Sequence, residues 1–262
     1  MKIELNDRVI VITGGSEGIG KGIAKTVASC GGKVAIISRD ENDMKSVVEL
    51  IESGGGHAMY HPADVSDSGQ LRDAFRSIFE HFGGIDGVVA NAGTNGTWAP
   101  VDELSPEEWR KTIDVNLTGT FLTLHHAVPY LRKRGRGSIV IVSSINGTRT
   151  FTNEGASAYA TSKAGQLAFG KMLSLELAQS RIRVNVVCPG AIRSNIHEKT
   201  QREDLEEIEV PVEYPEGNVP LTGGEMGDPE DVASMTAFLL SDLASHITGT
   251  PVWIDGAQSI LE

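Results

Sequence analysis

Short apolar runs alternate with amphipathic helical stretches along the whole chain, and this alternation constrains the fold more than any other feature. The runs typical of strands are residues 8–13, 33–38, 57–61, 85–91, 138–143, 183–188 and 251–254. The stretches with helical periodicity are residues 18–30, 41–53, 68–82, 105–134, 158–179 and 229–240. Such alternation is typical of a parallel sheet with helices on both faces. We therefore predict an α/β fold in which residues 1–262 form a single domain, a doubly wound parallel sheet of about seven strands.

The character of the strands also predicts where a ligand binds. The runs at 9–12 and 34–37 are apolar on both faces, as expected of central strands in a parallel sheet. In open sheets of this kind, ligands bind in the crevice beyond the carboxyl ends of the strands. The residues that follow each strand are therefore the candidates for a functional site.

A glycine-rich loop joins the first predicted strand to the first predicted helix. It reads Thr13-Gly-Gly-Ser-Glu-Gly-Ile-Gly20, with Gly14, Gly18 and Gly20 in a Gly-x-x-x-Gly-x-Gly pattern. Glycine lets the backbone approach a pyrophosphate closely, and the N-terminus of the following helix favours the anion. An ordinary glycine-rich turn is the alternative, but the position between strand and helix favours dinucleotide binding.

The end of the second strand bears on the choice of cofactor. A carboxylate usually holds a free ribose 2′-hydroxyl at this place, whereas this chain has Ser38 followed by Arg39. Serine leaves room for a 2′-phosphate, and the guanidinium of Arg39 offers that phosphate a planar fork. We predict NADP as the preferred cofactor. NAD is the alternative, because Glu17 would lie unfavourably near a 2′-phosphate and Asp40 could accept a ribose hydroxyl.

The segment 144–163 carries the strongest indication of chemistry. If a helix begins near Tyr159, Lys163 lies one turn further on and on the same face. A phenol has a reference pKa of about 10, and a cation held nearby lowers that pKa. A hydroxyl from Ser144 can hold a carbonyl or alcohol oxygen beside the phenol. These residues predict a tuned acid/base, although an isolated Tyr-x-x-x-Lys also fits a half-buried tyrosine beside a solvated lysine.

These motifs, in this order, resemble the classical short-chain dehydrogenase/reductase family over nearly the whole chain. The resemblance implies a Rossmann-type fold and an NAD(P)-dependent oxidoreductase, a carbonyl reductase or secondary alcohol dehydrogenase. It implies that the catalytic residues are Asn116, Ser144, Tyr159 and Lys163. It implies that the cofactor is bound by Gly14, Ser16, Glu17, Gly18, Ile19, Ser38, Arg39, Asp64, Val65, Asn91, Ala92, Gly93, Tyr159, Lys163, Pro189, Gly190, Ile192 and Ser194.

The resemblance also suggests what individual residues do. Asp64 and Val65 are similar to the pair that meets the adenine ring. Asn116 is similar to an asparagine that helps to hold a water linking the catalytic lysine to solvent. The stretch between Ser144 and Tyr159 is longer than the family's common spacing, which leaves Ser143 as an alternative to Ser144.

Composition and local patterns exclude several classes of protein. The net charge of −12 offers no basic stripe for nucleic acid. No apolar run approaches membrane-spanning length, and the N-terminus lacks signal-peptide character. The two cysteines, Cys30 and Cys188, have neither metal nor redox spacing. We therefore predict a cytoplasmic protein with a small-molecule substrate, without a metal and without a nucleic-acid or membrane partner.

The substrate end of the site is predicted from the remaining loops. The stretch at 191–227 is too long for an ordinary connection and is predicted to form a lid over the substrate. Residues 94–98 and 146–154 are expected to wall the pocket, with Trp98 either lining it or anchoring its loop. Arg149 and Glu154 are polar candidates for substrate contact or simply solvent-facing residues.

The sequence leaves one alternative open for the assembly of the protein and one for its function. The family resemblance implies that the helices at 105–134 and 158–179 pair with symmetry mates, giving a homotetramer or a dimer. Their apolar residues, Phe121 and Met172 among them, fit that pairing, but a single core-facing stripe would also explain them. The alternative function is a catalytically silent dinucleotide-binding sensor or scaffold. Neither the substrate nor the physiological direction of reaction follows from the sequence.

Overall fold

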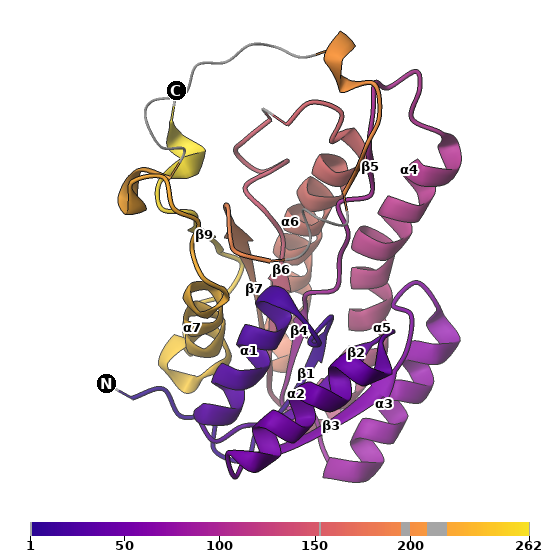
Figure 1. Ribbon diagram of the computed structural model, residues 1–262. Coiled ribbons are helices and arrows are strands. Elements are labelled where there is room, and N and C mark those ends of the chain that lie inside the picture. The colour runs from indigo at the N-terminus through magenta and orange to yellow at the C-terminus, as the bar shows by residue number, and fades with distance from the viewer. Residues whose placement is uncertain (1, 152, 195–199, 209–218, 262) are drawn as a thin grey trace.

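Seven parallel strands form one sheet in the computed structural model, which describes residues 2–151, 153–194, 200–208 and 219–261. The order across the sheet is β3-β2-β1-β4-β6-β7-β9 (Figure 1). These strands are β1 (Val9–Thr13), β2 (Lys33–Ser38), β3 (His57–Pro62), β4 (Gly87–Ala90), β6 (Gly137–Val142), β7 (Ile182–Pro189) and β9 (Pro251–Ile254). The predicted doubly wound parallel sheet is confirmed.

Helices cover both faces of this sheet (Figure 1). One face packs against α1 (Gly18–Ser29), α2 (Glu41–Ser53) and α7 (Pro229–Leu240), and the other against α3 (Ser68–Phe82), α5 (Gly119–Arg134) and α6 (Ser157–Leu177). The two faces follow from the alternation of side chains along each strand. In β1, Ile10 and Ile12 enter the first core, whereas Val9 and Val11 enter the second.

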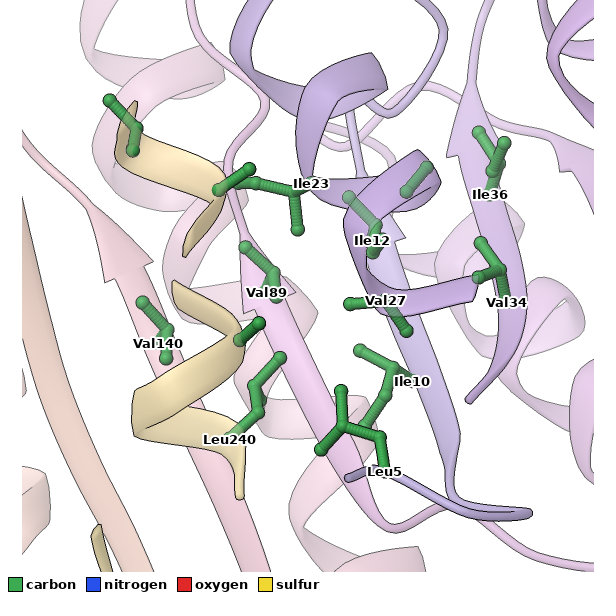
Figure 2. Packing of buried hydrophobic residues seen from close by; sticks show 14 of the residues in the cluster. Leu5, Ile10, Ile12, Ile23, Val27, Val34, Ile36, Val89, Val140 and Leu240 are labelled. Carbon is green, nitrogen blue, oxygen red and sulfur yellow. The ribbon is translucent and has the colours of Figure 1, made fainter. Parts of the chain in front are cut away.

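The first core fixes the position of the glycine-rich loop. Ile10 and Ile12 of β1 belong to the same buried cluster as Ile23 and Val27 of α1, and all four are at most 1% exposed (Figure 2). Gly22 lets α1 approach α7, since a Cβ there would lie 2.9 Å from the Cβ of Pro229. Because β1 and α1 are locked together in this way, the loop between them has little freedom.

The helix predicted at 105–134 is present and helical from Pro106 to Arg134, but it is not α-helical throughout. The structure has α4 (Pro106–Ile113), then a π-helical segment at Asp114–Thr118, then α5. Within the π-helical segment, Asn116 accepts from the backbone N of Thr94 and donates to its carbonyl oxygen, both at 2.8 Å. The segment Asp114–Thr118 contains neither glycine nor proline, so its residues carry no sign of a change in hydrogen bonding there. Turns of π-helix are frequent at functional sites.

A second, two-stranded sheet was not predicted. In it β5 (Thr97–Trp98) pairs in parallel with β8 (Gln201–Arg202), so that Trp98 lies opposite Arg202. The partners are far apart in the chain, and no local pattern signals such a pairing. It brings part of the predicted lid against the predicted pocket wall at 94–98.

Short helical turns complete the part of the chain that the structure describes. They are Ala178–Ser180, Leu205–Glu207, Pro220–Thr222, Asp242–Ala244 and Gln258–Ile260. Among the described helices, none has the length and apolar character needed to cross a membrane.

Candidate active site

A cavity of about 520 Å³ lies beyond the carboxyl ends of the strands, where the sequence predicted the site. Of the predicted site residues, those that line it are Gly14, Ser16, Glu17, Gly18, Ile19, Ser38, Arg39, Asp64, Val65, Asn91, Ala92, Gly93, Ser144, Tyr159, Lys163, Pro189, Gly190, Ile192 and Ser194. The remaining predicted site residue, Asn116, does not line the cavity and is fully buried.

The loop after β1 forms a backbone cradle. Gly14 and Gly18 have positive φ angles of 63° and 50°, a conformation that glycine adopts readily. A Cβ at Gly20 would lie 2.0 Å from the carbonyl oxygen of Gly14, so no side chain fits there. The side chain of Asn91 donates to the carbonyl oxygens of Thr13 and Gly14 at 3.1 and 3.0 Å. With the N-terminus of α1 beyond it, this cradle fits the diphosphate of a dinucleotide.

The end of β2 forms the far side of the same cavity. The hydroxyl of Ser38 lies 3.1 Å from that of Ser16. Arg39 is largely exposed, and its guanidinium lies 3.9 Å from a carboxylate oxygen of Asp64. Asp40 caps α2 by accepting a backbone N–H at 3.0 Å. A ribose hydroxyl would therefore compete with that capping bond for the Asp40 carboxylate.

The hydroxyl of Tyr159 and the ammonium of Lys163 come from the first turns of α6. Their side chains are nearly buried, and the Nζ of Lys163 lies 5.5 Å from the centre of the Tyr159 ring. Nζ donates to the carbonyl oxygen of Val142 at 3.1 Å. The side chain of Ser144, which follows β6, lies beside that of Tyr159, and its hydroxyl accepts from the backbone N of Asn146 at 3.1 Å. The predicted catalytic side chains of Ser144, Tyr159 and Lys163, from the segment after β6 and from α6, thus lie at one place in the cavity.

The structure separates the two serines that follow β6. The hydroxyl of Ser143 donates to the backbone carbonyl of Lys163 at 2.8 Å, which ties the strand to the helix. Ser144 instead faces Tyr159. The hydroxyl next to the phenol is therefore that of Ser144, and the longer loop before Tyr159 does not shift this arrangement.

Burial dominates the ionisation of this pair. Burial raises the pKa of Tyr159, and the nearby hydroxyl of Ser144 offsets that rise only in part. Burial lowers the pKa of Lys163 to about 8. The pKa of Tyr159 in this structure is therefore shifted upward, not downward as expected from a nearby cation, because burial is the main cause and Nζ of Lys163 donates to the carbonyl oxygen of Val142. Tyr159 therefore carries its proton at neutral pH, which is the form that donates to a carbonyl oxygen, but the upward shift by itself makes it a weaker acid.

Asn116 links the π-helical segment to α6. Its Nδ2 donates to the hydroxyl of Ser162 at 3.0 Å, and its backbone carbonyl oxygen accepts from Nε2 of Gln166 at 2.8 Å. A Cβ at Gly93 would lie 3.3 Å from Oδ1 of Asn116 and 3.5 Å from Nζ of Lys163, so the space beside Gly93 adjoins both. Sequence reasoning missed Ser162 and Gln166, although their i, i+4 spacing places them on one face of the helix.

The other end of the cavity is lined by side chains from the predicted walls. They are Thr94, Asn95, Trp98, Asn146, Thr150, Asn153, Arg202 and Met226. Gln258 was missed; it comes from the C-terminal turn and accepts from the backbone N of Ala191 at 2.8 Å. Arg149 stacks on the ring of Trp253, 3.5 Å from its centre. Within the predicted lid at 191–227, residues 195–199 and 209–218 lie outside the described residues.

Known proteins resemble this chain over nearly its whole length. A family model described as enoyl-(acyl carrier protein) reductase matches residues 14–257. Glucose 1-dehydrogenase 2 of Bacillus subtilis (strain 168) is 32% identical, over 98% of this chain and 96% of that protein. The crystal structure of a 3-ketoacyl-ACP reductase from Sinorhizobium meliloti 1021 has a TM-score of 0.93 at 51% identity, over 96% of this chain and 99% of that chain. The structure of a 3-ketoacyl-(acyl-carrier-protein) reductase from Brucella melitensis complexed with NADH has a TM-score of 0.86 at 29% identity, over 98% of this chain and 100% of that chain.

Proposed function

The chain belongs to the classical short-chain dehydrogenase/reductase family, and from this premise we propose that it interconverts a ketone and a secondary alcohol with NADP, using Tyr159 as the acid/base. Membership makes the protein an alcohol or carbonyl oxidoreductase that uses a nicotinamide dinucleotide and a small-molecule substrate. One observation carries the finer proposal. A single cavity joins the glycine cradle to the hydroxyls of Ser144 and Tyr159.

The proton-handling roles follow from the side chains in this cavity. When bound, the nicotinamide ring supplies or accepts the hydride. The hydroxyls of Ser144 and Tyr159 donate hydrogen bonds to the carbonyl oxygen of the substrate, and Tyr159 passes its proton to that oxygen as negative charge develops. Lys163 stabilises the resulting phenolate, and Asn116 belongs to the route by which the proton is replaced from solvent. In the oxidative direction these roles reverse.

The residues around the cradle would hold the cofactor. We assign the diphosphate to the backbone from Gly14 to Ile19 and the adenine to Asp64 and Val65. We assign the ribose next to the nicotinamide to Lys163 and Asn91-Ala92-Gly93. The nicotinamide itself is assigned to residues that follow β7: Pro189, Gly190, Ile192 and Ser194. We assign a 2′-phosphate to Ser16, Ser38 and Arg39, which favours NADP; NAD is the alternative.

The preference for NADP predicts a specific effect of Arg39→Gln. Because a hydrogen bond to a charged group contributes about 1.5–3 kcal/mol, the substitution should weaken NADPH binding by roughly 10- to 150-fold. NADH binding should change little. The wild-type protein and the Arg39→Gln variant are each titrated with NADPH and with NADH. Nicotinamide fluorescence reports binding and gives the four dissociation constants.

A matched control for Arg39 is Arg76→Gln, which removes an exposed arginine of α3 that is paired with Asp73. This variant should bind both cofactors as the wild-type protein does. Tighter binding of NADH than of NADPH by the wild-type protein would reverse the proposed preference. Equal weakening of both cofactors in Arg39→Gln would remove Arg39 from the discrimination.

We also propose that α5 and α6 form a face between copies of this chain, giving a tetramer or dimer. Leu124 and Leu173 of these helices are buried in the core, but Phe121, Met172 and Leu175 are 48%, 69% and 77% exposed. A single core-facing stripe therefore does not account for all of their apolar residues. Burying such side chains between copies would be favourable.

The assembly proposal predicts that Leu175→Glu yields smaller particles than the wild-type protein in light scattering at micromolar concentration. A charge buried between two copies costs far more than one left in water. Leu50→Glu is the control, because Leu50 is 48% exposed on α2, far from this face in the fold. A wild-type monomer under these conditions would disprove the pairing.

Two further proposals concern the domain as a whole and its place in the cell. We propose that residues 1–262 act as one catalytic domain whose stretch at 191–227 closes over the substrate, and that the protein works in the cytoplasm. Both cysteines are free, and Cys188 is buried, which suits a reducing compartment. Proteolysis with and without cofactor and substrate tests the closure, since a closed segment should be cut more slowly.

The rival to an enzyme is a silent sensor or scaffold that binds a dinucleotide. A cofactor titration combined with an activity assay separates the two, because a sensor binds the cofactor without consuming it. The assay should cover sugars, cyclic ketones, steroids and acyl thioesters. Consumption of reduced cofactor with any of them supports the enzyme.

A further inference from the structure

We infer that the substrate carries an anionic group, a carboxylate or a phosphate, and that Arg202 binds this group at the end of the cavity beyond Tyr159. The inference rests on the proposed function, because it names the substrate class of the same site. Arg202 lines the cavity together with Trp98. A guanidinium is a planar fork that matches both anions.

The pairing of β5 with β8 holds the backbone around Arg202. On one side, Nδ2 of Asn95 donates to the hydroxyl of Thr200 at 2.7 Å. On the other side, the backbone N of Glu203 donates to the carbonyl oxygen of Trp98 at 3.0 Å. The backbone of Arg202 is thus held by hydrogen bonds of Thr200 before it and Glu203 after it, whereas its side chain is exposed to solvent. A binding group placed in this way loses little backbone freedom when it meets a ligand.

The indole of Trp98 directs the guanidinium. Trp98 lies opposite Arg202 in the strand pair, and the guanidinium carbon is 5.3 Å from the centre of its ring. The ring is itself held, since Nε1 donates to the carbonyl oxygen of Asn95 at 3.2 Å. It also packs against Tyr159 and Ala156. One fixed ring therefore contacts both the phenol and the guanidinium, so a compact substrate could reach both.

The charges along the cavity favour an anion at this end. In the described lining, the carboxylates are those of Glu17 in the glycine loop and Asp64 after β3, at the cofactor end. Lys111 also lines the cavity but pairs with Glu108 at 3.5 Å. None of the ion pairs between described residues involves Arg202. The described lining at the substrate end thus contains the guanidinium of Arg202 and no carboxylate, although Glu203 follows Arg202 directly in the chain.

The neighbouring side chains favour a compact polar substrate. Asn146, Thr150 and Asn153 line this end of the cavity with amide and hydroxyl groups. Such groups lose hydrogen bonds to water if a large hydrocarbon covers them. An oxo or hydroxy compound with one carboxylate or phosphate would satisfy them and Arg202 together.

Binding to the oxidised cofactor complex tests this inference without turnover, because an oxidised cofactor cannot reduce an oxo compound. The protein is saturated with NADP⁺ or NAD⁺, whichever binds more tightly, and titrated by calorimetry. The probes are 3-oxocyclohexanecarboxylate, its primary amide and 3-oxocyclohexyl phosphate. We expect at least one anion to bind about tenfold or more tightly than the amide. The ranking of the two anions then distinguishes a carboxylate substrate from a phosphate substrate.

Variants connect that preference to Arg202. Arg202→Gln should bring the ratio of anion to amide affinity close to one, whereas Arg202→Lys should keep part of it. Arg76→Gln on α3 should leave the ratio unchanged, and melting temperatures verify that each variant is folded.

Two results would overturn the inference. One is equal affinity of the wild-type complex for the anions and the amide, which includes no measurable binding of any probe. The other is an anion preference that survives Arg202→Gln. Because no hydride moves in this experiment, a protein that fails to turn over substrate can still show the anion preference, and an active enzyme can lack it.

Discussion

Tyr159→Phe is expected to lower turnover by about 10²–10⁴-fold, the usual contribution of a positioned proton donor. Phenylalanine keeps the ring that packs against Trp98 and Ala156 but removes the hydroxyl that faces Ser144. The fold and the cofactor cradle should therefore persist. Rates are read from the absorbance of the reduced cofactor, and cofactor affinity from its fluorescence.

A second tyrosine provides the control. Tyr130 on α5 packs against Phe79, with ring centres 5.1 Å apart, and belongs to the core rather than the cavity. Tyr130→Phe should retain wild-type rates. If Tyr159→Phe also retained them, Tyr159 would have no place in the mechanism; if it lost cofactor binding in parallel, the lower rate would not show a role in proton transfer.

Lys163→Met is expected to abolish most activity and yet to stabilise the fold at neutral pH. Burial lowers the pKa of Lys163 from 10.5 to about 8, so folding disfavours its charged form. Methionine has a similar length and no charge. One pKa unit corresponds to about 1.4 kcal/mol, so the gain in free energy of unfolding is on the order of 1–3 kcal/mol, after the lost bond to Val142 is allowed for. Activity falls because the phenolate of Tyr159 loses its stabilising cation.

The stabilisation should depend on pH in a defined direction. The pKa of Lys163 is about 8 in the folded protein and 10.5 in the unfolded chain. Between these two pH values the unfolded chain therefore binds more protons than the folded protein. The wild-type protein therefore gains stability as the pH rises through this window. The advantage of Lys163→Met is largest below pH 8 and shrinks towards pH 10.5.

Urea denaturation at neutral pH and again near the upper end of that window measures this difference. Lys171→Met is the matched control, because Lys171 is an exposed lysine on the same helix. Its stability relative to the wild-type protein should change little with pH. A Lys163→Met protein less stable than wild type at neutral pH would show that the buried ammonium contributes more through its hydrogen bond than burial costs it.

Local sequence patterns were sufficient to predict the seven-stranded sheet and the helices that cover it. The strand at 33–38 has the same bounds as β2, since an apolar run bounded by glycine and charged residues leaves few other choices. The strand at 85–91 was too long, because β4 pairs only over Gly87–Ala90. Ends of elements depend on the neighbouring strand and so are not set by local sequence alone.

The glycine-rich end of the cavity was also predictable from the sequence. Parallel strands end at the same edge of a sheet, so loops that follow β1, β2, β4 and β7 must meet. The glycine pattern at Gly14 and Gly18 marks a conformation that the structure has. The Tyr159 and Lys163 pair follows equally from helical spacing.

The substrate end was predictable only as a set of loops. Arg202 reaches the cavity because β8 pairs with β5, and Gln258 because the C-terminal turn folds back over Ala191. Both depend on contacts between distant segments. The direction of the Tyr159 pKa was missed for a related reason, since burial depends on the whole fold rather than on the spacing to Lys163.

Transfer of deuterium from the cofactor to a carbonyl carbon tests the proposed chemistry most directly. The wild-type protein, given NADPH deuterated at the transferring position of C4, is incubated with oxo compounds from sugar, cyclic, steroid and acyl thioester classes, and the products are analysed by mass spectrometry. We predict an alcohol that carries one deuterium on its carbinol carbon, formed by the wild-type protein and lost in Tyr159→Phe. Tight binding of NADPH with no deuterium in any product would contradict the account and favour the sensor.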